Sequence, residues 1–314
     1  MTRTKVGRFT GEEAKEEFLR AYEQAMELWP RPRREADVET SFGIVHVHRY
    51  GTGEGDPVVL LHGAGANAAT WYPQVAALGE RHPVIAVDTI DDPGRSVQHT
   101  VVAGSAGNAR WVNEVLAGLD LRRVHLVGLS YGGWLALNQA VHGPERLASV
   151  ILLDPGGVSR VPAKFFLNMI AGALAMLAPR RFRPRLGRLL ANAALMSPPE
   201  LMKPIMMGYR TFGPTRPPAR PFTDEELRAV SVPTFALLAG RSALLDVSAA
   251  RRRIQNLIPA AQVDILPKAG HGLPLEFPDL VNQHILRFID AQTPDAQTPA
   301  NERPQVDLRE PPRS

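Results

Sequence analysis

The 314-residue chain contains no cysteine, which excludes a disulfide framework and a thiolate metal site. An absence of thiols is compatible with a reducing compartment, and we expect a cytoplasmic protein. Long apolar runs are also lacking: the longest, FFLNMIAGALAMLA at 165–178, is too short to span a bilayer. The charged N-terminus has no apolar segment typical of a secretory signal. We therefore expect no stable membrane insertion.

The chain also lacks a large excess of positive or of negative residues. The net charge is +4, from 36 basic and 32 acidic residues, and aromatic residues make up only 6% of the chain. No stripe of Lys and Arg interleaved with aromatic residues is present, so we expect no nucleic-acid partner. His46 and His48 belong to an early strand pattern, and the sequence analysis predicts no metal site there.

From about residue 38, short apolar runs alternate with stretches of helical periodicity. Runs such as PVVLLHG, VHLVGLS and LASVILLD are almost continuously apolar, which is typical of strands buried on both faces. The predicted fold class is therefore α/β, with a mainly parallel, doubly wound sheet. We assign this core to residues 38–156 and 230–290.

Three segments lie outside this core. Residues 157–229 break the alternation and are predicted to form an inserted helical cap, whereas residues 291–314 are Pro-rich and polar and are expected to be disordered. Residues 1–37 are predicted to form a helical extension, begun by a capping box of Thr10 and Glu13. Four of its residues share one helical face: Phe18, Tyr22, Ala25 and Trp29.

The segment Gly128-Leu-Ser130-Tyr-Gly132 matches the pattern G-x-S-x-G between an apolar strand and a helix. A serine at so tight a turn needs a strained backbone, and small residues two positions away on either side avoid clashes. The turn raises the hydroxyl above the edge of the sheet, beside the positive end of the helix dipole. Ser130 is therefore the predicted nucleophile.

Together with this motif, VVLLHGAGANAATW, IAVDTIDDPGRS and KAGHGLPLE resemble segments of the α/β-hydrolase fold, over about residues 40–290. The resemblance implies a serine hydrolase with an oxyanion hole made by the backbone N–H groups of Ala64 and Tyr131. It also implies that His271, in the Gly-flanked loop AGHGLP, is the general base.

The third member of a catalytic triad is harder to assign. Relatives of this fold usually carry an acid about three residues past the glycine that ends the strand VPTFALLAG, yet Ser242 and Ala243 occupy that position. Asp246 is the nearest acid, but it directly precedes a helical segment and is well placed to be its N-cap. Asp154 ends an earlier strand, where some members of the fold carry the acid. We favour Asp154, with Asp246 or a Ser–His dyad as alternatives.

The predicted function is hydrolysis of a small carboxylic ester, lactone or similar acyl compound through an acyl-enzyme on Ser130, without a cofactor or metal. The alternatives are a C–C bond hydrolase or cofactor-free perhydrolase with the same Ser and His, and a non-catalytic ligand-binding protein. An apolar substrate is expected, because the predicted cap supplies apolar side chains that can line a pocket: Phe165, Phe166, Met169, Ile170, Leu174 and Leu177.

Overall fold

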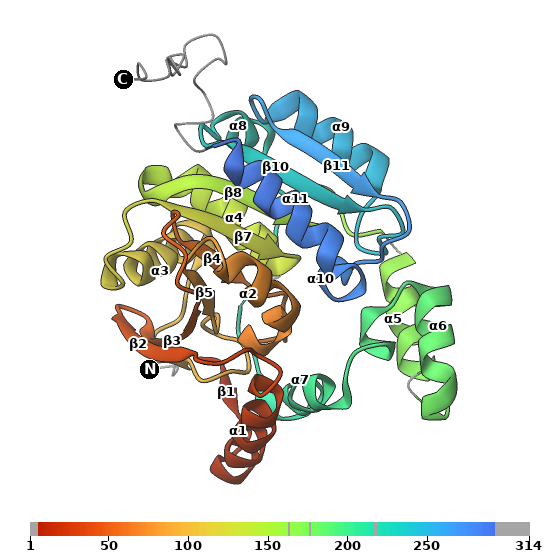
Figure 1. Cartoon of the computed structure of the whole chain (residues 1–314). Helices are drawn as coiled ribbons and strands as arrows, with labels where there is room; N and C mark the ends of the chain where they lie inside the picture. Colours follow the sequence, from red (N-terminus) through yellow and green to blue (C-terminus); the bar gives the residue numbers. More distant parts are fainter. Residues whose placement is uncertain (1–5, 163, 176, 217–218, 293–314) are drawn as a thin grey trace, which may run out of the picture.

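The computed structural model describes residues 6–162, 164–175, 177–216 and 219–292. Its centre is a sheet of nine strands, eight of which follow the order β11-β10-β8-β7-β4-β5-β3-β2, while β6 pairs with β3 (Figure 1). The strands are β2 (Arg34–Thr40), β3 (Gly43–Tyr50), β4 (Val58–Leu61), β5 (Val84–Val87), β6 (Val97–Gln98), β7 (Val124–Leu129), β8 (Leu147–Leu153), β10 (Thr234–Ala239) and β11 (Gln262–Leu266). The predicted tail lies outside the described residues from position 293 onward.

The sheet is mainly parallel. All pairings from β11 to β5 are parallel, whereas β3 pairs antiparallel with β5, β2 and β6. The expected α/β class and parallel sheet are thus confirmed. Because parallel strands need crossover connections, the helices between them cover both faces of the sheet.

Alternate residues of the central strands pack into two separate hydrophobic clusters, one on each face of the sheet. In β4, Val59 and Leu61 face one hydrophobic cluster, while Val58 and Leu60 face the other. The first cluster includes buried residues of α3, α4 and α9, and the second includes residues of α1, α2 and α11. The helices are α1 (Glu12–Met26), α2 (Tyr72–Gly79), α3 (Gly104–Gly118), α4 (Tyr131–His142), α5 (Lys164–Ala175), α6 (Arg183–Leu190), α7 (Pro199–Thr211), α8 (Asp224–Arg228), α9 (Val247–Leu257), α10 (Leu273–Glu276) and α11 (Pro278–Asp290).

Between β8 and β10 the chain forms the helical insertion α5–α7, which is consistent with a cap. Its last long helix, α7, packs along α1, so the N-terminal extension and the insertion lie side by side (Figure 1). The short strands β1 (Arg8–Phe9) and β9 (Phe212–Gly213) also pair antiparallel. The extension therefore contacts the insertion, which the sequence did not reveal.

The predicted capping box at Thr10 and Glu13 is wrong. Helix α1 begins at Glu12 after Gly11, and no side chain caps it. The backbone N–H of Thr10 instead donates to the carbonyl of Thr211, at 2.7 Å. Pairing with the end of α7 thus replaces the local cap. The expected apolar face is present, since Phe18, Tyr22 and Ala25 are buried.

A capping box is found at α8. The Thr223 hydroxyl accepts from the N–H of Glu226 at 3.2 Å, and the Glu226 carboxylate accepts from the N–H of Thr223 at 2.8 Å. Arg220 also donates to Glu226, at 2.8 Å. Chiefly because of this bond to Arg220, the pKa of Glu226 falls to about 2.

We predict that Glu226→Gln lowers the free energy of unfolding at neutral pH by more than it does in acid. A carboxyl whose pKa is lower in the folded state stabilises the fold above its unfolded pKa, near 4.5, and this contribution disappears as the pH falls toward 2. Urea unfolding across this range measures the difference, with Glu225→Gln on the same helix as the control. A difference that stays constant with pH would contradict the prediction.

Candidate active site

Ser130 lies in the turn between β7 and α4 with a left-handed backbone, φ 57° and ψ −112°. Glycines make this turn possible. A Cβ on Gly128 would lie 2.1 Å from the carbonyl oxygen of Gly132, and one on Gly132 would lie 2.0 Å from that of Leu61. Both glycines of the motif are therefore required by close backbone contacts. The strained serine is the geometry expected of a nucleophile at such a turn.

The loop after β4 lies beside Ser130. A Cβ on Gly63 would be 3.4 Å from the Cβ of Ser130 and 3.9 Å from its Oγ. Ala64 is the next residue of this loop, and Tyr131 is the first residue of α4. Among the described residues, the backbone N–H groups of Ala64 and Tyr131 make no hydrogen bond. Both donors are thus available to an oxygen of a substrate.

Asp154 follows β8 and is fully buried, with a positive φ of 43°. Strand pairing brings it near Ser130, because the N–H of Ser130 donates to the carbonyl of Leu153 at 3.0 Å. Its carboxylate accepts three hydrogen bonds: from Nδ1 of His271 at 2.7 Å, from the hydroxyl of Ser242 at 2.6 Å, and from the N–H of Ala239 at 3.1 Å.

These bonds fix the tautomer of His271. A carboxylate only accepts, so Nδ1 carries the proton and Nε2 of the neutral ring keeps its lone pair. Among the described residues, neither this Nε2 nor the hydroxyl of Ser130 makes a hydrogen bond. Such bonds often tighten only when substrate is bound. The side chain of His271 is 31% exposed, so the ring remains accessible from outside.

Ser242 occupies the position at which the resemblance placed an acid. Its hydroxyl donates to Asp154 and accepts from the N–H groups of Leu244 and Leu245 at 3.1 and 3.2 Å. Asp246 is exposed, and its carboxylate accepts from the N–H of Ala249 at 3.0 Å as the N-cap of α9. The structure therefore brings Asp154, not Asp246, to His271.

Other buried groups hold the loop of Ala64. The N–H of Thr89 donates to Nε2 of His62 at 3.1 Å, and Nδ1 of His62 bonds to the carbonyl of Gly63 at 2.8 Å. The carboxylate of Asp92 accepts from the N–H of Gly65 at 2.7 Å and from the hydroxyl of Thr89 at 2.9 Å. His62 is thus a structural side chain of the loop.

Arg216, from the segment after α7, connects the insertion to this loop. Its guanidinium lies 2.8 Å from the Asp92 carboxylate and sits over the ring of Tyr131, with 5.0 Å from Cζ to the ring centroid. Burial raises the pKa of Asp92, and the charge of Arg216 opposes that rise. Arg216 therefore contacts groups next to both candidate oxyanion donors. Sequence analysis missed it, because no local pattern marks an arginine that pairs across the fold.

Tyr209 of α7 also reaches this loop. Its hydroxyl donates to the carbonyl of Ala64 at 3.3 Å, and its ring would clash with a Cβ on Gly65, which has φ 75°. The insertion thus contributes two side chains, Tyr209 and Arg216, beside the loop of Ala64.

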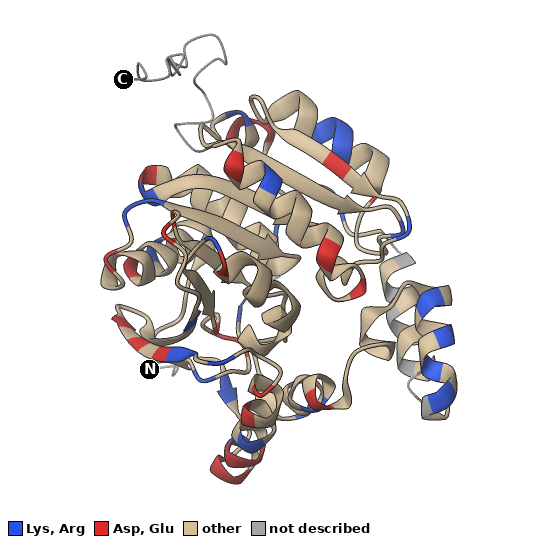
Figure 2. Cartoon of the chain, in the orientation of Figure 1, with Lys and Arg blue, Asp and Glu red and all other residues tan. Residues whose placement is uncertain are grey.

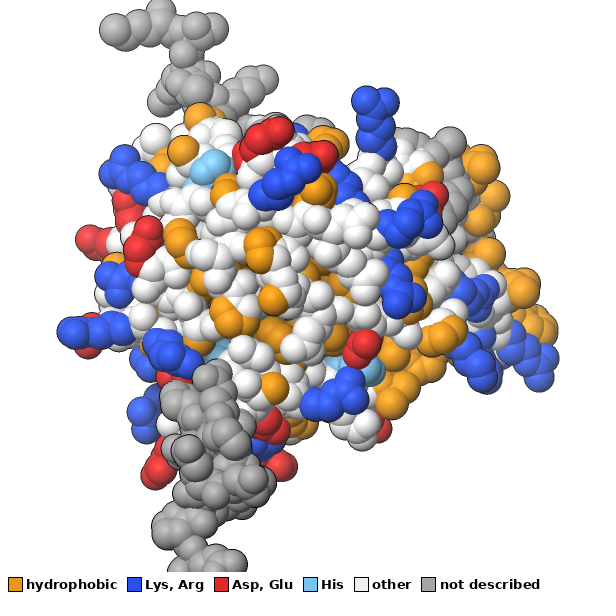
Figure 3. All heavy atoms as spheres, turned by 90° about the horizontal axis from the view of Figure 1, so that it is seen from above, with side chains coloured by type: hydrophobic (Ala, Val, Ile, Leu, Met, Phe, Trp, Pro, Cys, Tyr) orange, Lys and Arg blue, Asp and Glu red, His pale blue; other side chains and the backbone are white. Residues whose placement is uncertain are grey.

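The apolar residues expected to line a pocket are partly at the surface. Ile170, Leu174 and Leu177 are 59%, 63% and 81% exposed, whereas Phe165 is half-buried against the core. The side chains of Phe166 and Met169 lie outside the described part of the chain. Basic side chains cluster on α6 (Figure 2), and hydrophobic and basic groups adjoin at this end of the molecule (Figure 3). Among the residues described, no helix has the length and apolar character needed to cross a bilayer.

The chain is similar to known hydrolases over most of its length. A sequence model of the alpha/beta hydrolase family matches residues 58–284, which contain all the candidate site residues. Carboxylesterase YbfK of Bacillus subtilis is 30% identical over 288 residues, covering 87% of this chain and 93% of that protein. The crystal structure of naproxen esterase (carboxylesterase NP) from Bacillus subtilis has a TM-score of 0.76 and 28% identity, and covers 88% of this chain and 99% of that one.

A second group of similar proteins is named for a different activity. A 2-hydroxy-6-oxo-6-phenylhexa-2,4-dienoate hydrolase of Burkholderia cepacia is 27% identical over 270 residues, covering 77% of this chain and 91% of that protein. The chain is therefore similar over most of its length both to carboxylesterases and to hydrolases of this second kind.

We predict that Asp154→Asn lowers kcat/KM by orders of magnitude, up to about 10⁴-fold, because an amide at this position favours the wrong tautomer of His271. Asp246→Asn is the matched control. It should leave kcat/KM nearly unchanged and lower the free energy of unfolding by at most about 1 kcal/mol, since the residue only caps α9. Ester-hydrolysis kinetics and urea unfolding of both variants check this, and the reverse pattern would make Asp246 the acid.

We predict that Arg216→Met lowers stability, by about 3 kcal/mol, because it leaves the buried Asp92 carboxylate without its cation. The double variant Asp92→Asn/Arg216→Met should be more stable than Arg216→Met alone. Urea unfolding measures both, with Arg210→Met, an exposed arginine of α7, as the control. If the losses in free energy of unfolding caused by Asp92→Asn and by Arg216→Met add up to the loss in the double variant, the two residues are not coupled.

Proposed function

Because the chain belongs to the alpha/beta hydrolase family, we propose that it is a serine hydrolase that cleaves a small carboxylic ester, a lactone or a similar acyl compound through an acyl-enzyme on Ser130. The observation that carries this proposal is the hydrogen bond of 2.7 Å between Asp154 and His271, formed next to a serine with a strained backbone. A serine, an oriented imidazole and a buried carboxylate are the parts needed for nucleophilic acyl transfer.

In the first half of the reaction, Oγ of Ser130 attacks the carbonyl carbon while Nε2 of His271 takes the hydroxyl proton. The carbonyl oxygen becomes an oxyanion that accepts from the N–H groups of Ala64 and Tyr131. Donors fixed in advance at such an oxygen are each worth about 3 kcal/mol of transition-state stabilisation. His271 then returns the proton to the leaving alcohol, and the acyl group remains on Ser130.

In the second half, His271 removes a proton from a water molecule, which attacks the acyl carbon. The bond from the acyl carbon to Oγ of Ser130 then breaks, His271 returns the proton to Oγ, and the carboxylic acid is released. Asp154 holds Nδ1 of His271 in its protonated form and balances the charge of the imidazolium. Ser242 and Ala239 donate to the same carboxylate and so keep it oriented. The sequence of steps balances without a cofactor.

The expected substrate is small and apolar around its acyl group. Proteins similar to this chain are named carboxylesterases, and one of them is named for an ester of naproxen. The insertion 157–229, proposed as a cap, adds Tyr209 at the carbonyl of Ala64 and so narrows the approach to the proposed oxyanion hole. We place the acyl group between this cap and the serine turn.

Hydrolysis of a carbon–carbon bond is the second candidate. The similarity to 2-hydroxy-6-oxo-6-phenylhexa-2,4-dienoate hydrolase favours it, because the substrate in that name carries a ketone carbon that an activated serine hydroxyl could attack. Esters and a vinylogous 1,5-diketone of that type distinguish the two candidates by their products: an alcohol and an acid in one case, and two carbon fragments in the other.

We predict that the wild-type protein hydrolyses p-nitrophenyl acetate and butyrate and is labelled by a fluorophosphonate, and that Ser130→Ala abolishes both. The reason is that the reagent and the esters both require an activated serine hydroxyl. Ser105→Ala, another serine at the start of a helix, is the control and should retain both properties. Well-folded wild-type protein without labelling or turnover would instead support a ligand-binding role.

A further inference from the structure

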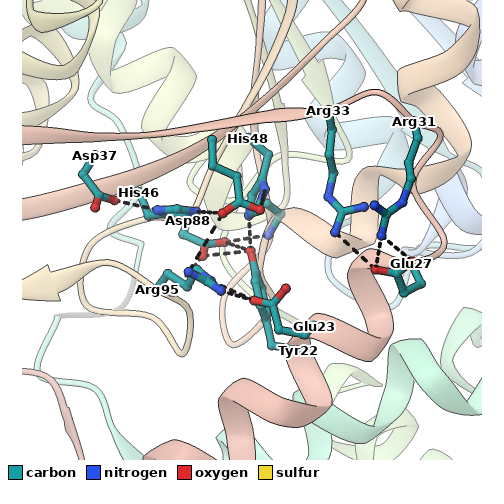
Figure 4. A network of polar contacts seen from close by, with 12 residues as sticks. Tyr22, Glu23, Glu27, Arg31, Arg33, Asp37, His46, His48, Asp88 and Arg95 are labelled. Atoms are coloured by element: carbon teal, nitrogen blue, oxygen red, sulfur yellow. Dashed lines mark hydrogen bonds and ion pairs between the residues drawn. The ribbon is translucent and has the colours of Figure 1, made fainter.

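A cluster of histidine and carboxylate side chains lies on the β2–β3 edge of the sheet, between the strands and α1 (Figure 4). We propose that Glu35, His46 and His48 of this cluster bind one divalent transition-metal ion of the zinc type, at a site separate from Ser130. Imidazole nitrogens and a carboxylate oxygen are ligands that Zn²⁺ prefers, whereas Mg²⁺ and Ca²⁺ favour oxygen alone.

Strand register brings the three residues together. In the antiparallel pair β2–β3, Glu35 lies opposite His48 and Asp37 lies opposite His46. Side chains two residues apart on a strand share a face, so all four project to the same side of the sheet. The ligand atoms of Glu35, His46 and His48 lie within 4.8 Å of one another.

The hydrogen bonds of His48 leave a lone pair directed at Glu35. Nε2 of His48 is 2.6 Å from the hydroxyl of Tyr22, which also lies 3.0 Å from the carboxylate of Asp88. That carboxylate only accepts, and it accepts from two backbone N–H groups as well. The single Tyr22 proton therefore goes to Asp88, and His48 donates from Nε2 to the phenol oxygen.

The ring of His48 is fully buried, and its bond to the Tyr22 hydroxyl uses Nε2. With the proton on Nε2, Nδ1 carries the lone pair. This Nδ1 is 3.5 Å from Oε1 of Glu35 and has no hydrogen-bond partner among the described residues. Two acceptors thus face each other, and a cation between them would make the arrangement favourable.

His46 repeats this pattern with a different partner. Its Nδ1 donates to the carboxylate of Asp37 at 2.6 Å. In the neutral ring, Nε2 then carries the lone pair and lies 3.7 Å from Oε2 of Glu35. Nε2 is buried and, in the described part of the chain, also lacks a hydrogen-bond partner. A carboxylate that fixes the outer nitrogen of a histidine is the usual second shell of a zinc ligand.

The two distances from Glu35 are close to those of a metal site, whereas the three ligand atoms, which lie within 4.8 Å of one another, would draw closer together around an ion. Ligand bonds of about 2.0–2.1 Å in a tetrahedral site place neighbouring ligand atoms about 3.3 Å apart, and the two N···O distances here are 3.5 and 3.7 Å. The side chain of Glu35 is 35% exposed, which gives a metal ion access from solvent and leaves room for a water ligand.

Charges around the cluster are mixed. Arg95 lies 3.9 Å from Glu35, but it also pairs with Glu23, and Arg33 lies close enough to lower the pKa of His48. The carboxylates of Glu35, Asp37 and Asp88 outnumber these two guanidinium groups. No metal was predicted here from the sequence, because only the register of β2 and β3 places Glu35 opposite His48. The proposed site is structural, since it would join β2 and β3 to α1 through Tyr22.

The test is titration of chelator-treated, metal-free protein with ZnCl₂ by isothermal titration calorimetry. We expect one zinc ion per chain and an increase in Tm, and Glu35→Gln should weaken binding at least tenfold. Glu35 is partly exposed, so this variant should fold. Glu39→Gln, at an exposed position on the same strand, is the matched control and should bind zinc like the wild type. Ser130→Ala should also bind normally.

X-ray absorption at the zinc edge provides the second readout, with two imidazole nitrogens expected at about 2.0–2.1 Å. No binding at about 100 μM zinc, equal binding by Glu35→Gln, or a spectrum without imidazole would overturn the proposal.

Discussion

The carboxylate of Asp154 is the group on which the candidate site depends. It is completely buried, and burial of an unpaired carboxylate is very unfavourable. Its three hydrogen bonds come from the end of β10, from the turn that follows β10, and from the loop after β11. One carboxylate therefore fixes three chain segments relative to the serine turn, and the proposed catalysis depends on the same contacts. The positive φ of Asp154 directs its side chain there at some cost in backbone energy.

The loop of Ala64 depends on a second buried carboxylate, that of Asp92. Asp92 is as buried as a core residue, and Arg216 gives its charge a partner from the insertion. The proposed oxyanion hole is consequently not built by the core alone. If the insertion moved outward, Asp92 would lose its cation, and the position of Gly65 would change with it. The buried ion pair thus favours one arrangement of the insertion on the core. Its effect is to select this arrangement over others, and its net contribution to the free energy of unfolding need not be large.

Much of this could be predicted from the sequence, because the signals are local. Apolar runs gave the strands, and the motif around Ser130 needs only neighbouring residues to specify its turn. The acid could not be decided in this way, since Asp154 and His271 are 117 residues apart in the chain and Ser242 had no local signature. Thr10 failed as a cap for a similar reason, because its backbone bonds to Thr211. Likewise, the pairing of Glu35 with His48 follows from strand register, which the sequence alone did not show.

In the described part of the structure, a carboxylate lies 2.7 Å from a histidine nitrogen in the pair Asp154–His271 and 2.6 Å in the pair Asp37–His46, and the surroundings of the two pairs favour different chemistry. In the pair of Asp154 and His271, the second ring nitrogen has no hydrogen-bond partner in the described structure and lies in a ring that is 31% exposed. A substrate can reach such a nitrogen, so the lone pair can act as a base. In the pair of Asp37 and His46, the second nitrogen faces the carboxylate of Glu35 and the ring is almost fully covered. A lone pair enclosed in this way has no access to substrate, and a cation is the partner that its charges favour. Solvent access and the facing group, rather than the pair itself, therefore separate a candidate base from a candidate ligand.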